Sequence, residues 1–188
     1  MKILHGPDMK PFDLKQDQIN FYHDNGYLVV GNLLSEEECD AINKLTRKHA
    51  DSSFSAILNP DRKFEEIHSV MKSPKIVSIL STLMNAEVVG LMSQVLFKEA
   101  GSPYAGQAWN PHQDNTYPQT PNGEYVTINI ALQDQNVENG CLYIYPGSHK
   151  EGLYPFEPTV SYHEDPKSNP GNMVDLSILK NLNQRKPI

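Results

Sequence analysis

The sequence has few cysteines and no long apolar run, and each shortage excludes a class of protein. Cys39 and Cys141 are the only cysteines among the 188 residues, and they lie far apart. Two such thiols form neither a disulfide framework nor a thiolate zinc site. The hydrophobic fraction is 38% and the mean hydropathy is −0.52. No apolar run approaches the roughly 18 to 20 residues that a membrane span requires, so we expect free thiols and no membrane-spanning segment.

Basic residues are also scarce, which bears on the possible partners. The chain has 16 Lys and Arg against 23 Asp and Glu, a formal net charge of −7. Such a balance repels phosphate backbones and lacks the basic stripe that nucleic-acid binding requires. Residues 1–7 contain no apolar core of a secretory signal. We therefore expect a cytoplasmic protein that binds neither nucleic acid nor membranes.

Proline divides the chain into two parts of different character. Of its 14 prolines, ten fall within the last 88 residues. Because proline disrupts helix interiors, we expect helices mainly in the first half and strands and loops in the second. The length favours one domain over residues 1–188. Within it we expect a helical part over about 14–86, strands from about 88, and a loop-rich stretch over 153–172.

Local signals predict three helices in the first half. The first covers about residues 14–25, with Gly26 placed to end it in a left-handed conformation. The second begins at Ser35, which forms the pattern of a capping box with Glu38, and continues to about residue 49. The third is opened by Ser73-Pro74 and carries apolar residues at spacings of three and four. This spacing indicates a core-facing helix.

The apolar period changes after the third helix. Residues 125–132 alternate between apolar and polar side chains, and 141–145 form a β-rich run between Asn139-Gly140 and Pro146-Gly147. Shorter β-favouring runs occur at 27–30, 88–92 and 95–97. Strands joined by Pro- and Gly-rich loops after a helical beginning predict a β-sandwich or jelly roll with helices on one side.

His112-Gln113-Asp114 is the most prominent candidate for chemistry. In an extended segment the side chains of residues i and i+2 leave the same face, so one imidazole and one carboxylate can reach a single cation. The spacing alone leaves a structural role open, because it recurs at His49/Asp51, His149/Glu151 and His163/Asp165. Those pairs lie at a predicted helix end, in a turn and in a charged loop. Only His112/Asp114 follows Asn110-Pro111, whose proline disfavours helix.

Several motifs follow one another in a fixed order between about residues 19 and 152. They are Phe21-Tyr22-His23-Asp24-Asn25-Gly26-Tyr27, Gln94-x-x-x-Lys98, His112-Gln113-Asp114-Asn115-Thr116-Tyr117, Asn129-Ile130-Ala131-Leu132 and Asn139-Gly140-Cys141-Leu142, which leads to Pro146-Gly147-Ser148-His149-Lys150. Together these motifs resemble the phytanoyl-CoA dioxygenase family. The resemblance implies a double-stranded β-helix, or jelly roll, that uses Fe(II), 2-oxoglutarate and O2 to hydroxylate an unactivated carbon.

The resemblance assigns His112 and Asp114 to the metal. Two imidazoles and one carboxylate on one face of iron leave positions for a bidentate 2-oxoacid and dioxygen. Related halogenases replace the carboxylate with a small residue, so Asp114 favours hydroxylation. The stretch Pro146-Gly147-Ser148-His149-Lys150 is typical of the family, but mechanically it predicts a tight turn closing a strand.

The resemblance also implies residues for the cosubstrate and the substrate. Gln94 and Asn129 correspond to strand residues that contact 2-oxoglutarate, although Asn129 replaces a common Trp. For both amides the satisfaction of buried backbone groups remains an alternative role. Trp109 and Tyr117 are candidates for substrate binding, with packing as the alternative.

Two residues that the family pattern requires have no counterpart in the expected setting. A distal histidine and an arginine for 2-oxoglutarate should follow Asp114, but only His149, His163 and Arg185 do so. We therefore expect this chain to lack the C-terminal part of the jelly roll and to be inactive by itself. The leading hypothesis is a dioxygenase that hydroxylates an aliphatic C–H bond of a small molecule. The alternative is a non-catalytic jelly-roll binding or interaction module without a complete metal triad. The substrate and the oligomeric state stay open.

Overall fold

The computed structural model describes residues 10–51, 55–102, 109–158, 171–174 and 177. The chain divides into two compact units, each with its own internal contacts. The first consists of residues 1–20, 29–98 and 130–134, and the second of 21–28, 99–129 and 135–188. No helix within the described ranges has the length and apolar character needed to cross a membrane.

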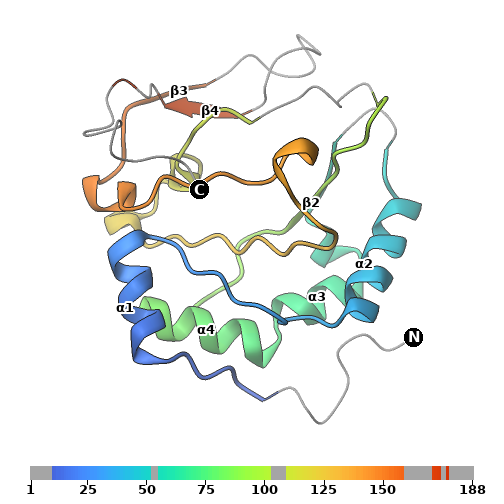
Figure 1. The fold of residues 1–188 in the computed structure, drawn as a ribbon, viewed down its shortest axis with the longest axis horizontal. Coiled ribbons are helices and arrows are strands. Elements are labelled where there is room, and N and C mark those ends of the chain that lie inside the picture. Colours follow the sequence, from blue (N-terminus) through green and yellow to red (C-terminus); the bar gives the residue numbers. More distant parts are fainter. Residues whose placement is uncertain (1–9, 52–54, 103–108, 159–170, 175–176, 178–188) are drawn as a thin grey trace. The chain divides into compact units, whose positions relative to one another are not determined.

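The described elements are short and mostly helical in the first half of the chain (Figure 1). The helices are α1 (Gln16–Asn25), α2 (Glu36–Lys48), α3 (Glu65–Met71) and α4 (Pro74–Met84). The strands are β1 (Ala56–Leu58), β2 (Gln94–Leu96), β3 (Phe156–Pro158) and β4 (Asn172–Val174). Single 3-10 turns are η1 (Pro60–Arg62), η2 (Asp114–Thr116), η3 (Pro121–Gly123), η4 (Val137–Asn139) and η5 (Ser148–Glu151).

The three predicted helices are confirmed, and their end signals act as expected. The Ser35 hydroxyl accepts from the Glu38 amide at 3.2 Å, and the Glu38 carboxylate accepts from the Ser35 amide at 2.8 Å. This reciprocal pair satisfies two donors that a helix start leaves free. Ser73 caps α4 by accepting from the Ile76 amide at 3.3 Å. Gly26 follows α1 at a φ of +79°, a conformation that glycine adopts readily.

The first unit has a core formed by α2, α3 and α4. Its buried residues are Ile42, Ile67, Val70 and Ile76. Because these residues come from all three helices, the apolar stripe of each helix faces the others. Ile130 and Leu132 pack against this core from the late segment of the unit.

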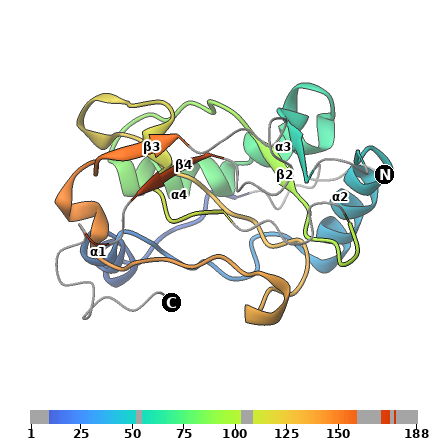
Figure 2. The same ribbon diagram turned by 90° about the horizontal axis from the view of Figure 1, so that it is seen from above.

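Each unit carries one antiparallel pair of strands. β1 pairs with β2 in the first unit, with Ala56 opposite Leu96. β3 pairs with β4 in the second unit, with Phe156 opposite Val174, and the two strands run side by side in Figure 2. Tyr154 and Val174 form a small second core beside β3 and β4. These two sheets are the only ones within the described residues.

The predicted jelly roll is not confirmed, because the part of the chain that the structure describes contains no closed barrel. Residues 125–132 and 141–145, expected as core strands, lie outside every strand and helix. The alternation at 125–132 predicts one buried face, yet Ile128 is 36% exposed, and Leu142 of the second run is 57% exposed. The first run also passes from the second unit to the first between Asn129 and Ile130.

Two shorter runs expected to favour strands also differ from the expectation. Residues 27–30 and 88–92 form no strand, and Val29 and Val89 are 78% and 92% exposed. The run at 95–97 overlaps β2. β3 and β4 lie at the two ends of the stretch that the sequence predicts to be loop-rich.

Candidate metal centre

The two sequence-predicted metal ligands lie on one short segment of the second unit. His112 precedes η2, and Asp114 is its first residue. Gln113 between them has an extended backbone, with φ −103° and ψ 131°. In that conformation residues 112 and 114 share a face, as the spacing predicted. The amide of Val174 in β4 donates to the Pro111 carbonyl at 2.9 Å and ties the segment to the second unit's sheet.

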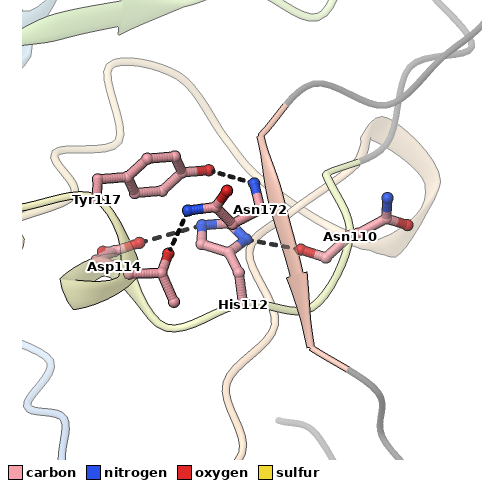
Figure 3. Close-up of polar contacts among 6 residues, drawn as sticks. Asn110, His112, Asp114, Tyr117 and Asn172 are labelled. Carbon is pink, nitrogen blue, oxygen red and sulfur yellow. Dashed lines mark hydrogen bonds and ion pairs between the residues drawn. The ribbon is translucent and has the colours of Figure 1, made fainter. Parts of the chain in front are cut away.

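His112 and Asp114 point toward one another (Figure 3). The Nε2 atom of His112 lies 3.1 Å from Oδ1 of Asp114. The Nδ1 atom lies 2.6 Å from the carbonyl oxygen of Asn110, which can only accept, so Nδ1 carries the proton. In the neutral ring Nε2 then presents a lone pair to a carboxylate. Such an arrangement is stable only with a cation between the two atoms, either a proton or a metal ion.

The electrostatics of the pair agree with this interpretation. The hydrogen bond with Asp114 raises the pKa of His112 above its usual value, against the opposing effect of burial. The same bond lowers the pKa of Asp114, and a hydrogen bond from Thr127 lowers it further, while burial acts in the opposite direction. Without metal and below the pKa of His112, the pair therefore holds one proton on Nε2. A divalent cation would take the place of that proton.

The donor types of the pair suit a divalent transition-metal ion. Imidazole nitrogen and carboxylate oxygen are both common ligands of such ions. Nε2 and Oδ1 lie 3.1 Å apart, so both atoms could reach one ion. One imidazole and one carboxylate are also two of the three ligands in the non-haem iron triad. Within the described ranges no group of three or more His, Cys, Asp or Glu residues is placed to hold a metal.

The two aromatic residues proposed for substrate binding flank His112. The ring of Trp109 lies 6.3 Å from the imidazole, centroid to centroid, and that of Tyr117 lies 5.9 Å away in an edge-on orientation. Trp109 is 38% exposed and Tyr117 49% exposed, so both retain surface that a ligand can contact. The structure thus brings these two residues together with the metal pair.

β4 and the glycine before it hold Tyr117 in place. The Asn172 amide donates to the Tyr117 hydroxyl at 3.0 Å, and the Asn172 side chain donates to the buried hydroxyl of Thr116 at 3.0 Å. Gly171 has a φ of +102°, and a Cβ atom there would collide with the Tyr117 hydroxyl and approach Trp109 to 3.2 Å. Only glycine permits this close approach.

The two residues proposed for 2-oxoglutarate, Gln94 and Asn129, belong to different units of the chain. Gln94 belongs to β2 of the first unit, where it is exposed and opposes Leu58. Asn129 is exposed at the end of a segment of the second unit. Their cosubstrate role stays a prediction.

The structure adds three residues that the sequence did not single out: Gln113, Thr127 and Asn172. Gln113 had one available signal, because the residue between two ligands on an extended chain points to the opposite face. Thr127 and Asn172 act on residues 13 and 56 positions away, and no local pattern marks such contacts.

Comparison with known proteins identifies relatives of this chain. A family model described as phytanoyl-CoA dioxygenase (PhyH) matches residues 22–184. A phytanoyl-CoA dioxygenase of Arabidopsis thaliana is 28% identical over 191 residues, covering 74% of this chain and 66% of that protein. The mouse phytanoyl-CoA dioxygenase domain-containing protein 1 is 32% identical over 139 residues, covering 73% of this chain and 43% of that protein. The chain thus spans just under two thirds of the plant relative and less than half of the mouse one.

A bacterial relative carries a more specific name. It is a "probable alpha-ketoglutarate-dependent hypophosphite dioxygenase" of Stutzerimonas stutzeri, 31% identical over 96 residues, covering 51% of this chain and 32% of that protein. No solved structure matches the chain.

Proposed function

This chain belongs to the phytanoyl-CoA dioxygenase family, and on that premise we propose that it is an Fe(II)- and 2-oxoglutarate-dependent dioxygenase that hydroxylates an aliphatic C–H bond of a small molecule. The relatives named as dioxygenases support the class of enzyme. The main support for the proposal is the His112–Asp114 pair. Its atoms Nε2 and Oδ1 lie 3.1 Å apart and both present lone pairs, so a proton or a metal ion must lie between them.

The residues of the site have distinct proposed roles. His112 and Asp114 hold the metal ion, and the Asn110 carbonyl keeps the imidazole in the tautomer that leaves Nε2 free. Thr127 orients the Asp114 carboxylate. With 2-oxoglutarate and O2, bound iron supplies the oxidising power for an unreactive C–H bond.

Trp109 and Tyr117 are the proposed contacts for the substrate. Both residues present exposed aromatic surface beside His112, which suits an apolar portion of a small molecule. Gln94 and Asn129 are the proposed contacts for 2-oxoglutarate. The intact His112–Asp114 pair favours this function over a binding module that has lost its metal.

A metal titration tests the proposal, because Trp109 is the only tryptophan of the chain. Its ring lies 6.3 Å from the His112 ring, so its fluorescence reports on this site alone. Under anaerobic conditions we expect Fe(II), or Co(II) as a stable substitute, to quench Trp109 in a saturable manner. His112→Ala should abolish the quenching, and the matched variant His68→Ala, on α3 of the first unit, should retain it. Unchanged metal affinity in His112→Ala would refute the metal assignment.

A further inference from the structure

Gln113 lies between the two proposed metal ligands, and its side chain bonds to the main chain of a distant segment. The side-chain Nε2 donates to the Gly152 carbonyl at 2.7 Å, and Oε1 accepts from the Tyr154 amide at 2.7 Å. We propose that Gln113 is a positioning residue that fixes the direction of His112 and Asp114. This inference rests on the proposed function and concerns a residue that does not touch the metal itself.

The amide side chain takes the place of a strand neighbour. A carboxamide carries the same donor and acceptor as a peptide group. Gln113 uses both toward residues 152 and 154, the i and i+2 groups that a paired strand would use. The segment that carries the ligands belongs to no strand. The side chain therefore supplies the sideways support that a sheet ladder would otherwise give.

The segment that Gln113 holds is itself firmly anchored. Tyr154 is 9% exposed and packs in the second core with Val174. Its hydroxyl donates to the Glu151 carboxylate at 2.5 Å. Through the Tyr154 amide, Gln113 is therefore bonded to a residue buried in the second unit.

The contacts that begin at Tyr154 lead back to the segment that carries His112 and Asp114. The chain continues from Tyr154 into β3, β3 pairs with β4, and Val174 of β4 donates to the Pro111 carbonyl. The ligand segment is thus held on both sides of His112, at Pro111 by β4 and at Gln113 by residues 152–154. Holding both points restricts rotation of the intervening backbone, which sets the direction in which the imidazole leaves the chain.

The contacts within η2 extend this control to Asp114. The Gln113 carbonyl accepts from the Thr116 amide at 2.9 Å, and the Asp114 carbonyl accepts from the Tyr117 amide at 3.2 Å. The turn that presents the carboxylate therefore begins at Gln113. A shift of Gln113 would move His112 and Asp114 relative to one another and open their 3.1 Å separation.

Two substitutions separate positioning from general stability. Gln113→Leu keeps much of the volume and removes both hydrogen bonds. Gln113→Glu keeps the acceptor for the Tyr154 amide but places a carboxylate oxygen against the Gly152 carbonyl, so one contact is replaced by repulsion. Gln135→Leu is the matched control, because Gln135 is an exposed glutamine of the same unit.

The experiment measures Co(II) binding by the full chain through Trp109 fluorescence, together with the visible absorption of bound Co(II). We expect both Gln113 variants to bind Co(II) about 10- to 100-fold more weakly than wild type, the usual effect of losing a residue that orients a metal ligand. The Co(II) absorption band should also change in shape, which a loss of stability alone would not cause. Gln135→Leu should match wild type in both measurements.

The outcomes distinguish the two proposals. If His112→Ala abolishes binding while both Gln113 variants bind like wild type, the positioning role is wrong and the metal assignment stands. If His112→Ala binds Co(II) as well as wild type, both are wrong. Circular dichroism establishes that each variant is folded, and should Gln113→Leu fail to fold, Gln113→Glu decides the question with its one retained hydrogen bond.

Discussion

Metal binding at the candidate site should depend on pH with a slope set by a single proton. In the metal-free site that proton lies on Nε2 of His112, whose pKa is raised mainly by its hydrogen bond with Asp114. A metal must displace it, so below that pKa the affinity should fall about tenfold for each pH unit. Above that pKa the imidazole is already neutral, and the affinity should be constant. The pKa of Asp114 is lowered, so the carboxylate binds no second proton over this range.

The assay is a Co(II) titration of Trp109 fluorescence at a series of pH values between about 5 and 8, where histidine titrates. A plot of log Kd against pH should have a slope of −1 at low pH and bend to zero at the pKa of His112. Asp114→Asn should weaken binding and move the bend to lower pH, because it removes the largest cause of the raised pKa. A constant Kd across the series, or a slope of −2, would show that this pair does not bind the metal as inferred.

Two further substitutions test how the scaffold is held. Ser35→Ala removes the acceptor for the Glu38 amide and should lower the free energy of unfolding by about 1 kcal/mol, as measured in urea; an unchanged urea midpoint would contradict the role of the cap. Gly171→Ala places a side chain at a φ of +102°, against the Tyr117 hydroxyl, and should cost about 1–2 kcal/mol or more and shift the Trp109 emission. Wild-type emission and melting temperature in that variant would show that the close approach is not required.

The helices could be predicted because their signals are local. Ser35 and Ser73 sit directly before the helices that they cap, and Gly26 directly follows the helix that it ends. Such bonds form within three or four residues and depend little on the rest of the fold. α3 went unpredicted because its first residue is preceded by Phe64, which provides no side-chain cap.

The strands could not be predicted with the same success, since a strand needs a partner that the sequence does not identify. Residues 125–132 have the right alternation, yet they pair with no strand among the described residues. β3 shows the converse, because it contains Pro158 and lies in a proline-rich stretch that predicts a loop. Its pairing with β4 supplies the order that its own residues do not indicate.

In the candidate site, too, the local features could be predicted from the sequence and the long-range contacts could not. The His112–Asp114 pair follows from a spacing of two and from the proline at 111, both of which are local. The contacts that hold the pair connect Gln113 to residues 39 and 41 positions later, and Thr116 to a residue 56 positions later. Only the folded chain brings these residues together, so their roles require the structure.

The turn after Pro146 shows that a motif typical of a family can have a structural role and need not take part in catalysis or metal binding. Its Gly147 amide donates to the Asn25 carbonyl at 2.8 Å, and Nε2 of His149 lies 3.0 Å from the carbonyl oxygen of His23. These are carbonyls of the last turn of α1, which lack partners within the helix. A Cβ at Gly26 would collide with the His149 ring, so that glycine both ends the helix and admits the turn. The motif therefore anchors η5 to the end of α1 within the second unit, and the histidine that it contains serves a helix terminus.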